Sequence, residues 1–381
     1  MDLDQFQAGA PGRLVAIGEG ASAFAPNPLP PAIDRSALFD AYGQAMAGIG
    51  SLNAKIAQLA NPSLIIRPLQ RREALTSSSM EGTYSTGDEL ALLEAGAEET
   101  ASTDTREVRN YISALTHAVA MMDRLPICHR LIKETHAKLL AGLPFARSGK
   151  KRPGEYKMEQ NWIGGATPQQ ARFVPPPPAE AVTAMDALEA FINRENPEAI
   201  PPLLEAALVH YQFETIHPFA DGNGRVGRIL IPLILLTRGL VSTPVFYPSA
   251  SMEGRKTEYI DRMFAVSAEG RWTEWLLFFL DVCADTCANS IAVIDRMLAL
   301  QAHYRKEAME RFRSNNVLIL IDQLFINPAI SAPMARSILG VSHRAARMTI
   351  ANLEEVGALE KMPGTSLPEY FVAREILRAG S

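Results

Sequence analysis

The chain has 381 residues, of which 37 are lysine or arginine and 42 are aspartate or glutamate, so its formal net charge is −5. At ~150 residues per domain this length predicts two or three units. A content of 47% hydrophobic and 21% charged residues is that of an ordinary globular protein. The mildly acidic balance disfavours a general polyanion-coating role, and three cysteines, an odd number, argue against a disulfide scaffold.

Membrane insertion and export are not expected from the sequence. The N-terminal residues MDLDQFQAGAPGRL contain no basic stretch followed by an apolar run. The most apolar segment, ILIPLILL at residues 229–236, is shorter than the ~18 residues that span a bilayer, and it contains a proline. We therefore expect a buried helix there, no membrane partner, and a cytoplasmic location. Cys283 and Cys287 lie one helical turn apart with no further Cys or His to complete a tetrahedral metal site, so they are expected in the core.

The first half of the chain mixes irregular and helical patterns. Residues 1 to about 50 are rich in proline and small residues, which predicts a mostly irregular arm followed by a helix from Ser36. Helical composition follows over residues 106–124 and 127–142. The stretch GEYKMEQNWIGGATPQQARFVP, from residue 154, mixes glycine, proline and β-formers and predicts a short β-hairpin or an ordered loop.

Four consecutive prolines within residues 173–180 force an extended chain before a run of helical patterns. Those patterns cover residues 179–196, 200–215, 223–240, 254–268 and 271–303. The sequence thus predicts an N-terminal segment over residues 1–105 and an all-α core over residues 106–305.

The tail, residues 314–381, has the pattern of a winged helix-turn-helix module. Three helices are expected, the last two joined by LGVS with glycine in the tight turn, and two short strands follow as a wing. From Ser314 onward six basic residues face six acidic ones, whereas phosphate neutralisation needs a basic footprint. His343, Arg344 and Arg347 stand at the start of the expected recognition helix. DNA contact therefore stays an alternative, and a protein-interaction or homodimerisation role is favoured.

The most informative stretch is HPFADGNGRVGR at residues 217–228. A glycine-rich turn stands directly before an apolar helix, whose first backbone N–H groups lack partners and can bind an anion. Arg225 and Arg228 share one face of that helix. Two cations at the positive end of a helix dipole are unfavourable unless an anion such as a di- or triphosphate lies between them.

Two further side chains add chemistry to this turn. Asp221 supplies a hard carboxylate that suits Mg²⁺, and His217 is the group there that can accept a proton near neutral pH. His210 lies seven residues earlier, ~10.5 Å away along a helix, so we assign it to packing.

These residues match, at every fixed position, the H-x-F-x-[D/E]-G-N-G-R-x-x-R motif, and the chain from about residue 40 to 300 resembles the Fic (Fic/DOC) family. Members typically transfer AMP from ATP to a Ser, Thr or Tyr hydroxyl of a target protein. The resemblance implies a Fic-type all-α fold with a β-hairpin flap, with ATP and Mg²⁺ as co-substrate and cofactor.

The resemblance also implies roles for the matching residues. His217 would be the general base, Asp221 the Mg²⁺ ligand, and Phe219 an inward-packing residue that fixes the loop. The implied nucleotide-binding set is Gly222, Asn223, Gly224, Arg225, Gly227 and Arg228. Tyr259 lies where relatives often carry a nucleotide-contacting aromatic residue.

A second match concerns regulation. Residues 77–82, SSSMEG, fit the family's [S/T]-x-x-x-E-[G/N] inhibitory motif, which here comprises Ser77, Glu81 and Gly82. The implied role is a salt bridge from Glu81 to Arg228 that occupies the γ-phosphate site. Because this motif precedes the core, the chain resembles the class with an N-terminal inhibitory helix.

The stretch GEYKMEQNWIG…RFVPPPP, residues 154–178, includes Tyr156 and Lys157 and resembles the family's flap. An extended flap backbone could pair with a target segment and present its hydroxyl to His217. The sequence therefore predicts a protein adenylyltransferase that modifies target proteins and itself. The alternatives are a de-AMPylase or another nucleotidyl or phosphoryl transferase on the same fold, and a nucleotide-sensing winged-helix transcriptional regulator.

Overall fold

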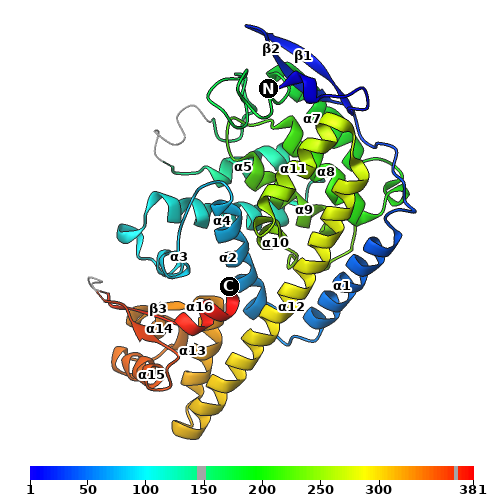
Figure 1. Ribbon diagram of the computed structural model, residues 1–381. Coiled ribbons are helices and arrows are strands. Elements are labelled where there is room, and N and C mark those ends of the chain that lie inside the picture. The colour runs from blue at the N-terminus through cyan, green and yellow to red at the C-terminus, as the bar shows by residue number, and fades with distance from the viewer. Residues whose placement is uncertain (144–151, 364–367) are drawn as a thin grey trace. The chain divides into compact units, whose positions relative to one another are not determined.

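The computed structural model describes residues 1–143, 152–363 and 368–381 (Figure 1). The chain divides into two compact units, each assembled from two separate segments. Unit 1 comprises Met1–Asn53 and Asn110–Cys287, and unit 2 comprises Ala54–Arg109 and Ala288–Ser381.

Three long helices contain the boundaries between the units: α1 (Phe39–Ala57), α4 (Thr103–Met121) and α12 (Trp272–Arg311). The division into residues 1–105, 106–305 and 314–381 was made along the sequence alone. That division describes consecutive segments of the chain, whereas each unit of the structure combines two separate segments, so the division stays a prediction.

In the part of unit 1 that the structure describes, a helical body carries one β-hairpin. Besides parts of the three long helices it contains η1 (Leu3–Gln5), β1 (Gly12–Gly18), β2 (Ala21–Pro26), α5 (His129–Leu139), α7 (Pro178–Ile192), η3 (Pro197–Ala199), α8 (Pro202–Ile216), α9 (Asn223–Thr237), α10 (Ser249–Glu253) and α11 (Lys256–Glu269). The mostly helical fold expected from the sequence is confirmed.

Helices α8 and α9 pack against each other in the core of unit 1 (Figure 1). Nearly every residue of both is buried, so neither helix presents a polar face to solvent. Trp275 is fully buried and donates its indole N–H to the Ala207 carbonyl at 3.1 Å. The segment ILIPLILL lies within α9, which confirms the buried helix expected there.

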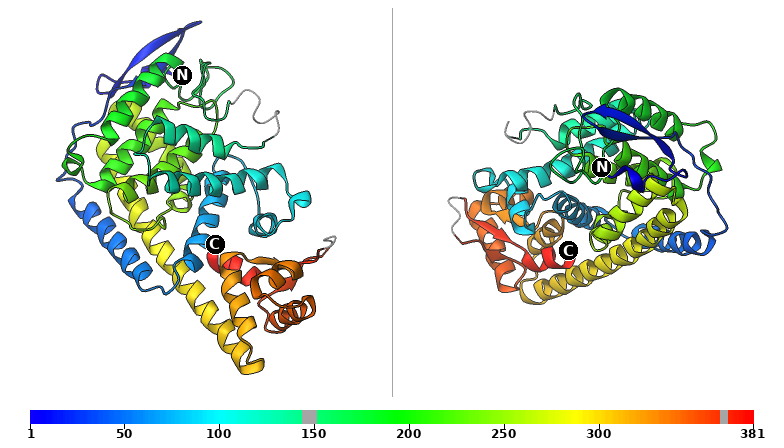
Figure 2. Two further views of the ribbon diagram at one scale, coloured as in Figure 1. Left: turned by 180° about the vertical axis from the view of Figure 1, so that it is seen from behind. Right: turned by 45° about the horizontal axis from the view of Figure 1, so that its top comes forward.

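The N-terminal arm contains a β-hairpin that the sequence prediction of a mostly irregular arm did not include. Strands β1 and β2 pair antiparallel, with Gly12 opposite Pro26, and form a hairpin that Figure 2 shows against the end of unit 1 near α7. Alternation of apolar and small residues in RLVAIG and ASAFA was the available signal. The proline-rich flanks obscured it.

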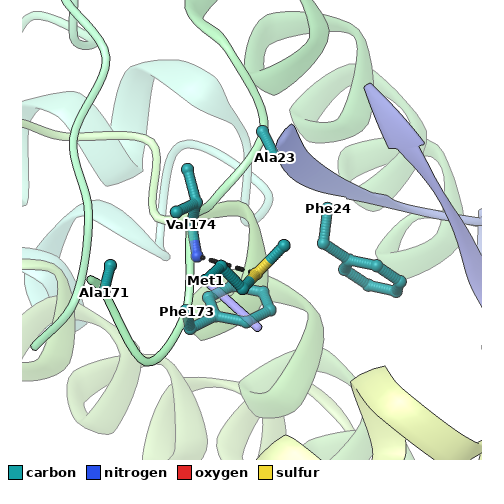
Figure 3. Packing of buried hydrophobic residues seen from close by; sticks show 6 residues of the cluster. All are labelled: Met1, Ala23, Phe24, Ala171, Phe173 and Val174. Atoms are coloured by element: carbon teal, nitrogen blue, oxygen red, sulfur yellow. Dashed lines mark hydrogen bonds between the residues drawn. The ribbon is translucent and has the colours of Figure 1, made fainter. Parts of the chain in front are cut away.

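Strand β2 packs on the end of the flap. Ala23 and Phe24 form a buried cluster with Met1, Ala171, Phe173 and Val174 (Figure 3). The Phe24 N–H donates to the Val174 carbonyl at 2.9 Å. The flap itself is an ordered loop with one isolated antiparallel bridge between Ile163 and Phe173, so the hairpin of unit 1 is β1–β2 and not the flap.

Unit 2 combines helices with a small sheet of order β3-β5-β4. Its elements, besides parts of the long helices, are α2 (Ser63–Ser79), α3 (Gly87–Glu94), η2 (Glu98–Thr100), α13 (Asn315–Ile326), β3 (Ala329–Ser331), α14 (Ala332–Leu339), α15 (His343–Glu355), β4 (Glu360–Lys361), β5 (Tyr370–Val372) and α16 (Arg374–Gly380). Helix α3 packs on the sheet through a cluster that includes Leu92, Ala329 and Val372.

The three helices and two strands predicted for the tail are present, and the structure adds strand β3 and helix α16, which were not predicted from the sequence. Helices α14 and α15 follow one another with Gly340 between them in the left-handed region (φ 64°), and β4 pairs antiparallel with β5. Several basic groups of the tail lie against carboxylates: Arg347 is 3.1 Å from Glu369, which also pairs with Lys361. Residues 364–367, between β4 and β5, lie outside the described residues.

Helix α12 is the one helix within the described ranges that is long and apolar enough to cross a bilayer by length and composition. Its most apolar 18-residue window has a mean hydropathy of 1.6, and 56% of that window is buried inside the protein. A buried core helix satisfies the same criterion. Cys283 and Cys287 lie in this helix as buried thiols, as expected.

Candidate active site

Helix α8 ends at His217, whose backbone lies in the left-handed region (φ 48°, ψ 59°). Its N–H donates to the Phe213 carbonyl at 2.9 Å, so the residue forms the cap of the helix. Glycine usually occupies such a position, because a side chain there costs roughly 1–2 kcal/mol. A histidine at this position indicates that the surrounding contacts hold the turn and aim the ring.

The ring of His217 has a defined tautomer. Its Nδ1 lies 3.3 Å from the Glu214 carbonyl oxygen, which can only accept a hydrogen bond. Nδ1 therefore carries a proton, and in the neutral ring the lone pair lies on Nε2. In its neutral form the half-buried ring thus has the tautomer that a general base needs.

The turn after His217 closes on itself through Asn223. The Phe219 N–H donates to Asn223 Oδ1, and Asn223 Nδ2 donates to the Phe219 carbonyl, both at 2.8 Å. Asn223 is 1% exposed and Phe219 is fully buried. The Asn223 side chain therefore shapes the loop, and its backbone N–H is the group it can offer to an anion.

His136, on α5, packs against this turn. It was not singled out from the sequence. Its ring stacks on Phe219 with centroids 3.8 Å apart. Nδ1 accepts from the Gly154 N–H and Nε2 donates to the Asp221 carbonyl, both at 2.9 Å. Burial lowers the pKa of His136 to about 4, so the ring is neutral. A histidine on the buried face of an amphipathic helix was the available signal.

Helix α9 starts directly after this turn. Its N-cap is Gly222 in the left-handed region (φ 77°), and no side chain caps the helix. A Cβ at Gly222 would lie 3.2 Å from Leu139 and 3.5 Å from His136, so glycine is required by both conformation and space. The leading backbone N–H groups, including those of Asn223 and Gly224, are the ones a helix leaves without internal partners.

Two arginines extend the positive end of α9. Arg225 and Arg228 are each 2% exposed, and the Arg225 guanidinium lies 3.9 Å from the partly exposed Asp221 carboxylate. Gly227 lets α8 and α9 approach closely, since a Cβ there would overlap the Glu214 carboxylate at 2.0 Å. Buried guanidinium groups beside a helix N-terminus favour the binding of an anion there.

The aromatic residue expected to contact a nucleotide lies in the interior. Tyr259 is 4% exposed, and its hydroxyl lies 2.8 Å from His210 Nε2. His210 Nδ1 donates to the Gly227 carbonyl at 3.1 Å, so Nε2 accepts from the Tyr259 hydroxyl. This agrees with the assignment of His210 to packing. The nucleotide contact of Tyr259 stays a prediction.

The flap lies beside the turn. Lys157 donates its backbone N–H to the Pro218 carbonyl at 2.8 Å. A hollow of about 330 Å³ is lined by flap residues that include Tyr156, Met158 and Trp162, together with Ala220 of the turn. Met158 and Trp162 are exposed, so this hollow offers apolar surface beside the turn that follows His217.

The expected inhibitory motif lies at the end of α2 in unit 2. Ser77 is fully buried, Glu81 is exposed, and Gly82 turns the chain with φ 80°. The run of serines therefore ends a helix, whereas its local composition alone favours a helix start. Glu81 belongs to unit 2 and Arg228 to unit 1, so the salt bridge between them stays a prediction.

Comparison with known proteins identifies the family. The model of the Fic/DOC family matches residues 126–235, which include α8, the turn and α9, and the Fic/DOC family N-terminal model matches residues 39–120. The chain belongs to the Fic/DOC family.

Relatives agree with this assignment. The "Protein adenylyltransferase Fic" of Drosophila virilis is 32% identical over 129 residues, and that of Drosophila grimshawi has the same identity over the same length. The match covers 34% of this chain, and it spans about a quarter (24%) of the length of those proteins.

Solved structures show the same fold. A Fic family protein from Desulfovibrio desulfuricans G20 aligns with a TM-score of 0.56 at 20% identity, covering 91% of this chain and 98% of that one. A Fic domain containing signaling protein from Bacteroides thetaiotaomicron gives 0.53 at 22%, covering 68% of this chain and 96% of that one.

Proposed function

We propose that this Fic protein is a protein adenylyltransferase, which transfers AMP from ATP to a hydroxyl side chain of target proteins and of itself. The observation that supports the proposal is the junction of α8 and α9. His217, with its Nδ1 proton held by a carbonyl, stands next to a helix N-terminus beside which two arginines are buried. This arrangement combines a base with a polyphosphate site.

The transfer step follows from the tautomer of His217. Nε2 accepts the proton of the target hydroxyl as the oxygen attacks the α-phosphorus of ATP. The new O–P bond forms while the bond between the α-phosphorus and the bridging oxygen breaks, and pyrophosphate leaves. Arg225, Arg228 and the N-terminus of α9 stabilise the negative charge that develops on the leaving group.

The donor set at Asp221 fits Mg²⁺. Its carboxylate is 35% exposed and lies at the start of α9. Among the described residues no group of three or more His, Cys, Asp or Glu side chains converges, so phosphate oxygens and water would complete the coordination of a bound ion. When bound, Mg²⁺ would neutralise phosphate charge and orient the phosphates.

Regulation, partners and location belong to the same proposal. Glu81 would inhibit by pairing with Arg228, and the hollow beside the flap would receive the target segment as an added strand. The pairing of Arg347 and Lys361 with Glu369 supports a protein-interaction or dimerisation role for the tail over DNA binding. Three free thiols accord with a reducing, cytoplasmic location.

The test is transfer of label from α-labelled ATP to protein. His217→Ala should abolish labelling while ATP still binds, because the arginines and the start of α9 are unchanged. His303→Ala, at an exposed position of α12, is the matched control and should label like the parent. Labelling retained by His217→Ala would remove His217 as the base.

A further inference from the structure

A single amide of the flap binds the backbone on both sides of Pro218. Asn161 Nδ2 donates to the His217 carbonyl at 3.2 Å and to the Phe219 carbonyl at 3.0 Å. The Phe219 carbonyl also accepts from Asn223 at 2.8 Å. The catalytic turn is therefore held from α9 on one side and from the flap on the other.

Lys157 fixes the orientation of that amide. Lys157 is only 5% exposed, and its Nζ donates to Asn161 Oδ1 at 2.7 Å. A flipped amide would set its oxygen against two carbonyl oxygens and its NH₂ against the lysine nitrogen. One orientation is therefore much preferred, and it gives both amide protons to the turn.

This arrangement does not depend on the charge of the lysine. Burial lowers the pKa of Lys157 to about 7. Both the ammonium and the neutral amine can donate to Asn161 Oδ1, and Nζ also lies 3.4 Å from the Ile216 carbonyl. Lys157 can thus hold the amide on either side of neutral pH.

The His217 backbone is the place where such support matters. Its left-handed conformation is unfavourable for a residue with a side chain, and a small rotation about it would move Nε2 away from a bound hydroxyl. The hydrogen bond from Asn161 restrains the carbonyl of this residue. The same bond links the flap, where a target would lie, to the base.

We propose that Asn161 and Lys157 are positioning residues, which couple the flap to the geometry of His217 and so set the rate of transfer without binding ATP. The inference rests on the proposed adenylyl transfer. Neither side chain belongs to the helix N-terminus or to the arginines that would hold the phosphates.

The discriminating variant is Asn161→Asp. A carboxylate still accepts from Lys157, but it cannot donate to the two carbonyls. We expect kcat to fall by about 10- to 100-fold, as misplacement of a catalytic group does, with the KM for ATP and the ATP affinity within twofold of the parent. Lys157→Met should give the same pattern, and the double variant should add little to either.

Asn193→Asp is the matched control. Asn193 also donates its amide to two backbone carbonyls, those of Ile127 at 2.9 Å and Glu189 at 3.0 Å, but it caps α7 and does not contact the catalytic turn. This variant should keep the kcat of the parent. A kcat for Asn161→Asp within twofold of the parent, or a loss equalled by Asn193→Asp, would overturn the proposal.

A second readout separates this inference from the proposed function. ¹⁵N resonances of the His217 ring report its tautomer, which should be Nδ1–H in the parent and in Asn193→Asp, and a mixture in Asn161→Asp and Lys157→Met. If neither the parent chain nor its Glu81→Gly variant transfers AMP, the proposed function is wrong. The ¹⁵N spectra of the His217 ring then still test whether Asn161 and Lys157 position that ring. Unchanged spectra in both flap variants would refute the positioning role. If Asn161→Asp does not fold, Lys157→Met carries both measurements.

Discussion

Glu205 should be among the side chains on which the stability of the catalytic unit depends most. Its carboxylate is fully buried near the start of α8 and accepts four hydrogen bonds. Two come from Arg194, at 3.0 and 3.2 Å, and two from Arg238, at 2.8 and 2.6 Å. Arg238 also donates to the Ile192 carbonyl at the end of α7. One carboxylate thus joins the ends of α7 and α9 to α8.

Glu205→Gln keeps the shape of the side chain and removes its charge. The two guanidinium groups, 18% and 14% exposed, would then share a neutral amide. Breaking a buried ion pair from one side costs about 3–5 kcal/mol. At roughly 2–4 °C per kcal/mol for a unit of this size, we expect the melting temperature to fall by about 10 °C.

Differential scanning calorimetry checks this expectation. The control is Glu180→Gln, because the Glu180 ion pair with Arg13 lies at the surface, with side chains 36% and 59% exposed. Exposed pairs contribute about 0–1 kcal/mol, so its melting temperature should change little. If Glu205→Gln were no less stable than this control, the argument from buried charge would be wrong.

The remaining predictions concern regulation, pH and the tail. The Glu81→Gly variant should modify itself faster than the parent. The assay incubates each protein with labelled ATP, GTP, CTP and UTP in parallel, and ATP should be preferred. An unchanged rate would contradict the inhibitory role. Burial, with Arg228 adding to it, lowers the pKa of His210 to about 3, while an unfolded histidine titrates near 6.5. The unfolded state therefore binds more protons between these values, and the free energy of unfolding should fall as the pH is lowered from about 6.5 towards 3. His210→Gln should flatten that slope in acid titrations of stability, whereas His303→Gln should not. The tail should show no gel shift with DNA even at low salt, and salt-dependent binding would reverse this assignment.

The sequence identified the parts of the site that are local. The motif from His217 to Arg228 forms one helix end, one turn and one helix start, so its spacing already determines which groups meet. The same holds for the turn at Gly340, where a left-handed glycine separates two helices. Short-range geometry of this kind can be read from residue types.

The missed features of the site depend on contacts between distant segments. His136 meets the Asp221 carbonyl across 85 residues, and Asn161 meets the His217 carbonyl across 56. Nothing in the spacing of a single chain brings these groups together. The β1–β2 hairpin was missed for another reason: its two strands are neighbours in the chain, but their proline-rich flanks obscured the alternation. The contact of β2 with the far end of the flap is again one between distant segments.

That hairpin bears on where the catalytic unit can be cut for expression. The family match begins at residue 39, whereas Ala23 and Phe24 fill the cluster under Phe173 and Val174. A fragment trimmed to the family boundary would remove strand β2 and expose one end of the flap to water. Its Asn161 end would stay attached while the other end frayed. Recombinant fragments of this protein should therefore keep residues 1–26, because Met1 belongs to the same cluster, even though that region lies outside the matched domain.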